Sequence, residues 1–291
     1  MAGLKDIRNR IASVKSTKQI TSAMKMVAAA KLKKAQDRVL QIRPYADKMR
    51  DVLAEVSASL DKNHASKYGE VRKAEKVLVV LMASNRGLCG GFNSNICKRA
   101  MAHVKDAYPE QLAKGNVKFI CLGKKAIDFV TKQGYEIVAQ SEEIFDKLNY
   151  ATAMAIVDPI MEDFVAGKYD KVDLIYNSFK NAASQEQKVE AFLPFTIEGG
   201  DNKKPSDYIF EPSVDCIVED MIPKSMKIQF FKAVLDSFAA EQGARMTAMH
   251  QATDNATELI KTLTLMYNKA RQAAITNELS EITSGAEALK G

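Results

Sequence analysis

Cysteine, histidine and tryptophan are scarce, because the 291 residues include four Cys, three His and no Trp. The cysteines form no Cys-x-x-Cys pair and have no His at metal-ligand spacing, so we expect reduced thiols with packing roles. None of His64, His103 and His250 has a Cys, Asp or Glu at the spacing of a catalytic triad or a metal site. The sequence therefore predicts no catalytic residue, no metal site and no cofactor.

Long apolar segments are missing as well. No uninterrupted apolar run approaches the roughly 20 residues that a membrane-spanning helix needs. The N-terminal residues are basic and helical in pattern, without the apolar core and small-residue cleavage site of a signal peptide. We therefore expect a chain that is made and used in the cytoplasm and does not cross a membrane.

Glycine and proline are absent between Gly243 and Gly285. A helix of about forty residues can form there, roughly 60 Å long at about 1.5 Å per residue. Its large side chains recur at a three-four spacing, at Met246, Met249, Ala256, Ile260, Leu263, Tyr267, Ala270 and Ala274. This period of about 3.5 residues makes a narrow apolar stripe, which is typical of a helix that packs along another long helix.

A second long helix with the same period is predicted at the other end of the chain, from Leu4 to Leu60. Every heptad position in this range is apolar except Lys18, Thr21 and Lys25. The heptad stays in phase across Pro44, which predicts a kink rather than a break. Because a compact segment separates the two helices in the chain, they must pair antiparallel if they lie together.

The polar break in the N-terminal heptad has two interpretations. Its three polar residues could form a layer that sets the register of a coiled coil. Alternatively, the helix turns the apolar side chains of Ile20, Met24 and Val27 toward something other than its partner helix.

The middle of the chain has a different period. Strands are predicted at 76–83, 117–122, 135–139, 172–179 and 187–195, and helices at 95–108, 124–133 and 150–166. Strands that alternate with helices form right-handed βαβ units and a mostly parallel sheet. The predicted fold class is therefore α/β, a long antiparallel coiled coil of N- and C-terminal helices with an inserted Rossmann-like α/β domain.

Domain boundaries follow from these changes of period. The predicted domains are an N-terminal coiled-coil helix at 1–69, the inserted α/β domain at 70–212 and a C-terminal coiled-coil helix at 213–291. Pro212 and Pro223 confine residues 213–222 to a short separate helix at most.

A glycine-rich loop, SNRGLCGGFNSN (84–95), follows the first predicted strand. Open α/β sheets bind phosphates at this place, at a helix N-terminus. The glycines match neither GxGxxG nor GxxxxGK[ST], and no acidic residue ends the second strand. A nucleotide-binding α/β protein is therefore the weaker alternative, beside glycines that only allow a tight turn between strand and helix.

Positive charge is concentrated in the first fifty residues, which hold thirteen Lys or Arg and three acidic residues. A basic helical arm suits nucleic acid, an anionic membrane or an acidic protein. Tyr45 is the only aromatic residue in the arm, so the side chains that stack on bases are missing and an acidic protein is favoured. A basic coiled-coil binder of membranes or nucleic acid stays a second alternative.

Three segments carry a resemblance to a known family. They are ITSAMKMVAAAKLKKAQ (20–36), SNRGLCGGFN (84–93) and the C-terminal ARMTAMHQATDNATELI with LTLMYNKARQAAITNELSEITSGAEAL (244–260 and 263–289). Together they resemble the gamma subunit of F-type ATP synthases, and the likeness spans both end helices and the insert. A chloroplast-type regulatory insertion and a mitochondrial presequence are missing, which favours a bacterial member.

The resemblance implies a rotor subunit of the central stalk, without a catalytic site, a cofactor, a nucleic acid or a small-molecule substrate of its own. In the family, the paired end helices turn inside a ring of alternating alpha and beta subunits. The inserted domain touches the epsilon subunit and the membrane c-ring, which proton flow turns. The implied location is peripheral, at the cytoplasmic face of the bacterial inner membrane.

The family's contact residues can be carried over onto this sequence. The contact with the beta lever falls on Met24 and Lys25. The catch near the top of the shaft falls on Arg271, Gln272, Thr276 and Glu278. The loop on the c-ring and epsilon side falls on Tyr208, Phe210 and Glu211, although Phe at position 210 replaces a residue that is often polar or Tyr.

Overall fold

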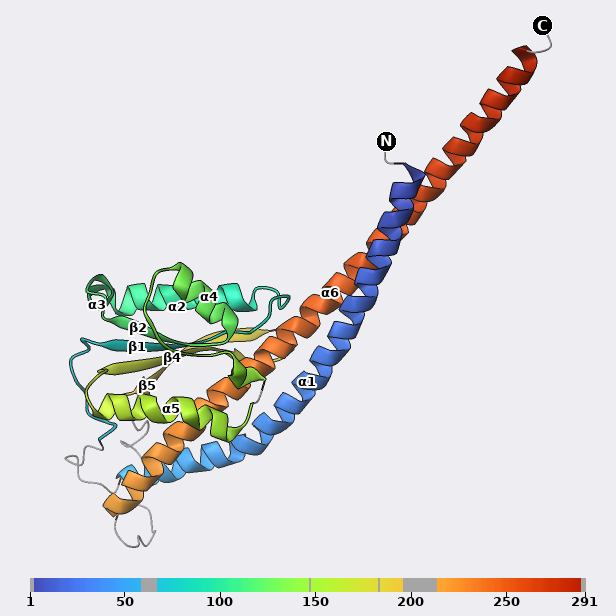
Figure 1. Cartoon of the computed structure of the whole chain (residues 1–291). Coiled ribbons are helices and arrows are strands. Elements are labelled where there is room, and N and C mark those ends of the chain that lie inside the picture. The colour runs from blue at the N-terminus through green and yellow to red at the C-terminus, as the bar shows by residue number, and fades with distance from the viewer. Residues whose placement is uncertain (1–2, 59–66, 147, 183, 196–213, 289–291) are drawn as a thin grey trace. The chain divides into compact units, whose positions relative to one another are not determined.

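The computed structural model describes residues 3–58, 67–146, 148–182, 184–195 and 214–288 (Figure 1). The chain divides into two compact units, one made of Met1–Ala28 with Met246–Gly291 and the other of Ala29–Arg245. We refer to the first as the coil unit and to the second as the body. The helices α1 (Leu4–Ala58) and α6 (Val214–Ala288) contribute residues to both units.

A five-stranded sheet with the order β3-β2-β1-β4-β5 forms the centre of the body. Its strands are β1 (Val77–Met82), β2 (Val117–Leu122), β3 (Ile137–Ser141), β4 (Lys171–Phe179) and β5 (Gln185–Leu193). The first four strands pair in parallel, and β5 is an antiparallel edge strand on β4. The predicted mostly parallel sheet is thus confirmed, and the two edge strands are shifted by two residues from their predicted ranges.

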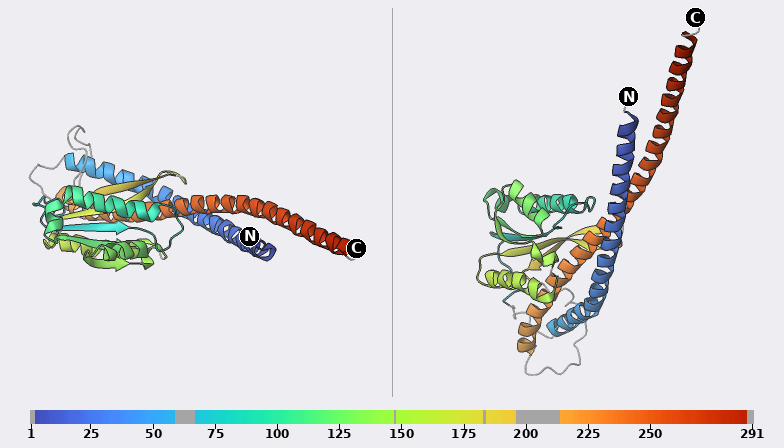
Figure 2. Two further views of the ribbon diagram at one scale, coloured as in Figure 1. Left: turned by 90° about the horizontal axis from the view of Figure 1, so that it is seen from above. Right: turned by 45° about the vertical axis from the view of Figure 1, so that its right-hand side comes forward.

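Helices cover both faces of this sheet, as the right-hand view of Figure 2 shows. They are α2 (Phe92–Ala107), α3 (Pro109–Ala113), α4 (Lys124–Lys132) and α5 (Tyr150–Val165), with a 3-10 turn η1 (Glu143–Phe145) before α5. α2 begins three residues earlier than predicted, and the sequence analysis missed the short helix α3. α5 runs through Pro159 as predicted, after a capping box in which Asn149 accepts the N–H of Thr152.

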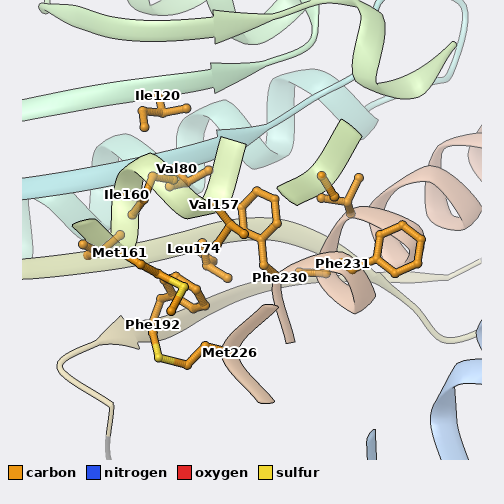
Figure 3. Packing of buried hydrophobic residues seen from close by; sticks show 14 of the residues in the cluster. Val80, Ile120, Val157, Ile160, Met161, Leu174, Phe192, Met226, Phe230 and Phe231 are labelled. Carbon is orange, nitrogen blue, oxygen red and sulfur yellow. The ribbon is translucent and has the colours of Figure 1, made fainter. Parts of the chain in front are cut away.

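Alternating side chains along β1 supply two separate cores. Leu78, Val80 and Met82 face the core under α5 and the first part of α6, whereas the odd-numbered residues face α2 and α4. All six residues are buried, because a central parallel strand is covered on both faces. Figure 3 shows the larger core, in which Phe230 of α6 packs with Leu174 of β4.

Helix α6 corrects one prediction. It begins at Val214 and continues through Pro223, so the predicted short helix at 213–222 is wrong. Proline removes one helical hydrogen bond and disfavours the preceding helical conformation. Here Ile222 and Met226, on either side of the proline, are both buried in the body core, and this packing outweighs the local cost. α1 likewise continues through Pro44, as its heptad predicted.

In the coil unit, the start of α1 lies antiparallel beside α6 in both views of Figure 2. The heptad positions of α1 from Leu4 to Ala28 are all buried or half-buried, and so are the predicted stripe positions of α6 from Met246 to Ala274. The predicted coiled-coil seam is therefore confirmed. α6 extends past the first residue of α1, and its side chains from Ile275 onward are exposed.

Candidate functional site

The seam of the coil unit contains one polar layer. Thr21 is buried, and its Oγ1 lies 2.9 Å from Oγ1 of Thr253. Thr253 occupies the position between Met249 and Ala256 at which the apolar stripe of α6 is interrupted. Each hydroxyl also lies within hydrogen-bond distance of a carbonyl in its own helix. This hydroxyl pair supports the interpretation of the polar break as a register-setting layer.

The outer face of α1 next to this layer is apolar. Ile20 and Val27 are 58% and 57% exposed, so they point away from the seam, while Met24 is half-buried. This exposure agrees with the second interpretation for Ile20 and Val27, and what these side chains face stays a prediction. Lys18 and Lys25 are half-buried at seam positions, where an aliphatic stem can cover apolar surface while the ammonium group reaches solvent.

The end of α6 carries the polar group that the sequence singled out. Arg271, Gln272, Thr276 and Glu278 are all exposed on adjacent turns of this single helix. The hydroxyl of Thr276 donates to the carbonyl of Gln272 at 3.0 Å, so part of its hydrogen-bonding capacity is used within the helix. Because an α-helix turns by about 100° per residue, Arg271 and Glu278 lie on one side of the helix, and Gln272 and Thr276 lie together on a different side.

An apolar stripe separates these two polar sides, and the sequence analysis missed it. Ile275, Leu279 and Ile282 are 47%, 58% and 67% exposed. Their spacing of i, i+4 and i+7 was the available signal, because it places them on one helix face. Three large apolar side chains on an exposed helix face are typical of a surface that another protein covers.

The glycine-rich loop of the body is bound by an arginine of helix α6. Gly90 has φ +59, and the loop ends at the N-terminus of α2. The guanidinium of Arg245, on α6, donates to the carbonyl of Gly87 at 2.5 Å and to that of Arg86 at 3.4 Å. A phosphate cradle presents backbone N–H groups, whereas this loop presents carbonyls to a cation. The observed contacts of this loop therefore give the nucleotide-binding alternative no support.

The body contains a histidine–carboxylate pair that spacing along the sequence did not predict. His103 Nε2 lies 2.7 Å from Asp173 Oδ2, and the hydroxyl of Tyr108 donates to the same oxygen at 2.7 Å. Burial and the charge of Asp173 raise the pKa of Tyr108. The sequence separation of 70 residues hid this pair from spacing arguments. It satisfies a carboxylate buried in the central sheet, which is a structural role.

A second histidine–carboxylate pair was also not predicted. His250 Nδ1 lies 3.3 Å from Asp254 Oδ2, one turn along α6. Both side chains are exposed, so this is a surface pair with little effect on stability. Across the described part of the chain, no group of three or more His, Cys, Asp or Glu could hold a metal ion.

Comparison with known proteins places the chain in a family. A family model described as ATP synthase matches residues 3–289. The ATP synthase gamma chain of Christiangramia forsetii is 52% identical over 291 residues, covering 100% of both chains, and that of Cytophaga hutchinsonii is 48% identical over 293 residues, covering 99% of both. The chain belongs to the ATP synthase gamma-chain family.

A solved structure agrees with this gamma-chain assignment at the level of the fold. It is a chain of the Euglena gracilis mitochondrial ATP synthase, solved as OSCP/F1/c-ring in rotational state 3. The TM-score is 0.68 at 22% identity, and the match covers 98% of this chain and 94% of that chain. Long terminal helices and a mostly parallel sheet are therefore shared with a chain of a solved ATP synthase.

As a gamma chain, the protein is the central-stalk subunit of a bacterial F-type ATP synthase, and the catalytic sites lie in the beta subunits. Gamma chains are peripheral to the membrane, and among the described helices none is long and apolar enough to cross one. The predicted contact residues Tyr208, Phe210 and Glu211 lie outside the described residues.

Proposed function

We propose that the chain is the rotor that couples proton flow through the membrane c-ring to ATP synthesis or hydrolysis at the beta subunits. Its proposed partners are the alpha, beta and epsilon subunits and the c-ring, at the cytoplasmic face of the bacterial inner membrane. The observation that carries the proposal is the coil unit, in which a continuous seam joins two long helices and leaves the end of α6 without a partner helix.

The first proposed contact with beta is Met24 with Lys25. Both are half-buried next to the exposed apolar residues Ile20 and Val27, so an approaching helix would meet apolar surface and a positive charge together. Attraction of Lys18 and Lys25 to an acidic lever would act over a few ångströms and be screened by salt.

The second proposed contact is the end of α6. Arg271, Gln272, Thr276 and Glu278 would act as the catch, because their exposed side chains can form hydrogen bonds to the surrounding ring. The exposed stripe of Ile275, Leu279 and Ile282 supports this contact, because three apolar side chains would leave water when a ring surrounds the helix. Tyr208, Phe210 and Glu211 are the proposed residues toward epsilon and the c-ring.

Purification of the tagged chain from its native cell tests the proposed assembly. We expect alpha and beta subunits to copurify with ATP hydrolysis activity, and epsilon and the c-ring to copurify when the membrane is solubilised gently. Recovery of the chain alone, under conditions that keep known ATP synthases intact, would refute the assembly.

Neutralising two lysines tests the contact with beta. In the double variant Lys18→Gln and Lys25→Gln, we expect normal assembly but fewer protons pumped per ATP, because glutamine keeps the first part of the half-buried stem and removes the charge. The exposed Lys5 provides a matched control on the same helix, as Lys5→Gln. Unchanged ATP-driven proton pumping in the double variant would refute the proposed contact.

A further inference from the structure

Arg245 is the last residue of α6 that belongs to the body, and it is almost completely buried. Its Nη2 lies 2.5 Å from Glu241 Oε1, and the two side chains are only 11% and 9% exposed. Its Nη1 donates to the carbonyl of Gly87. The rigid guanidinium fork thus joins a carboxylate of its own helix to the backbone of a loop 158 residues away in the sequence.

The same loop is fixed from the side of the sheet. Ser84, two residues after the end of β1, donates its N–H to Asn93 Oδ1 at 2.9 Å and its hydroxyl to the carbonyl of Arg86 at 2.6 Å. The Arg86 carbonyl therefore accepts from Ser84 and from Arg245. Residues 86–87 are held between the end of a central strand and helix α6.

Small residues make further contacts between α6 and this end of the body, beside the stacking of Phe238 on Phe145 and a bond of 3.5 Å from Ser178 Oγ to Asp236 Oδ2. Ala240 and Ala244 pack with Cys89 and Phe92. A Cβ at Gly243 would lie 3.3 Å from the carbonyl oxygen of Ala182, so the helix approaches the turn between β4 and β5 closely. Contacts of this kind are non-directional, whereas the hydrogen bonds of Arg245 fix an angle and a position along the helix.

The loop also holds a backbone conformation that needs support. Leu88 has φ +63, a left-handed conformation that residues with a side chain rarely adopt, and its side chain is 65% exposed. Such a conformation persists where the surroundings determine it from several sides. Here the hydrogen bonds from Arg245 and Ser84 to the carbonyls of residues 86 and 87 hold the backbone just before Leu88 in place.

We propose that Arg245 is a positioning residue for torque transmission. It locks loop 84–91 to α6 at the point where the helix passes from the body into the coil unit, so that the body and the helix turn together. This inference rests on the proposed rotor function. Because the lock is directional and water is largely excluded from it, it resists sliding and twisting of α6 better than the Ala and Gly contacts alone.

The test compares three variants in complete ATP synthase complexes. Arg245→Met removes the lock and leaves Glu241 buried without its partner. Arg245→Met with Glu241→Gln also removes the lock but leaves no buried charge. Lys224→Met is the matched control, because it removes an exposed cation whose ion pair with Asp220 stays within α6.

Two measurements are made on each complex: protons pumped per ATP hydrolysed, and the labelling rate of Cys89 resolved by mass spectrometry. Cys89 is buried in the loop, while Cys97 and Cys121 are buried in the body core and report on general unfolding. Without the lock we expect pumping per ATP to fall by about twofold or more, a size typical of mutations that weaken coupling between sites. Cys89 labelling should accelerate in both lock variants, and Cys97 and Cys121 labelling should not.

The outcomes separate the lock from a simple effect of buried charge. Reduced pumping in the double variant, with Lys224→Met unchanged, supports the lock, and it does so even if the single variant fails to assemble. Wild-type pumping in the double variant overturns it, since the buried charge would then explain any loss in the single variant. If complexes with the wild-type chain do not pump protons at all, the proposed function itself is wrong.

Discussion

Loss of Arg245 should make the stability of the body depend on pH. In the folded protein, burial raises the pKa of Glu241, while the hydrogen bond and the charge of Arg245 lower it. Arg245→Met removes these two lowering contributions and leaves only that of the Lys31 charge, so the pKa of Glu241 rises further. Wherever the pH keeps Glu241 ionised, its carboxylate is then buried without the guanidinium partner, which is expected to lower the free energy of unfolding by about 3–5 kcal/mol.

The direction of the pH dependence follows from proton linkage. A carboxyl group whose pKa is raised on folding binds its proton in the folded state at a higher pH than in the unfolded chain. The resulting destabilisation is present above the folded-state pKa and disappears as the pH falls below the unfolded value. The stability of Arg245→Met should therefore approach that of a variant with a neutral side chain as the pH is lowered.

Urea unfolding followed by circular dichroism measures this effect. The reference is the variant with both Arg245→Met and Glu241→Gln, because it differs from the single variant only at the titrating group. We expect the reference to be more stable at about pH 7, and the difference to shrink steadily toward about pH 4.5. A difference that is independent of pH, or that grows as the pH falls, would refute the reasoning, because Glu241 would then not be the group responsible.

Three further predictions concern the core, the seam and the free end of α6. Phe230→Ala should lower the free energy of unfolding by about 3–5 kcal/mol, because Phe230 is fully buried, and equal denaturation midpoints for variant and wild type would contradict this. Thr253→Val should lower the free energy of unfolding by about 1 kcal/mol. The double variant with Thr21→Val should lose less than the sum of the two single variants, because the two hydroxyls bond to each other. Strictly additive effects in a double-mutant cycle would contradict the polar layer. Amide hydrogens of residues 275–288 should exchange rapidly with solvent in the isolated chain and slowly in the assembled complex, as measured by hydrogen-exchange mass spectrometry. Protection of these amides in the isolated chain would contradict the expectation that this end of α6 is stabilised only by the complex.

Periodic patterns were the reliable part of the sequence. The heptad of α1 up to Ala28 and the stripe of α6 correspond to buried or half-buried positions of the coil unit, because a repeat of about 3.5 residues places side chains on one helix face whatever the partner is. The strand runs were equally clear, since a strand covered on both faces needs an uninterrupted apolar run. The proposed domain boundaries at 69 and 212 stay predictions.

Local rules failed where distant packing outweighed them. Pro223 indicated a helix boundary, but α6 continues through it because Ile222 and Met226 are buried in the body. Pairs between distant residues were also hidden, including His103 with Asp173 and Thr21 with Thr253. Nothing in the local sequence around either residue indicates which residue the folded chain will bring to it.

The sequence by itself determined two long helices, a mostly parallel sheet between them and, through its resemblance, the gamma-chain family. These features depend on short-range periodicity, which a single chain records directly. Only the tertiary structure decided that the glycine-rich loop holds an arginine of α6 rather than a phosphate, and that the free end of α6 exposes an apolar stripe. The reason is physical: a loop carbonyl or an exposed face acquires its role from what lies beside it in space, and here that neighbour lies far away along the chain.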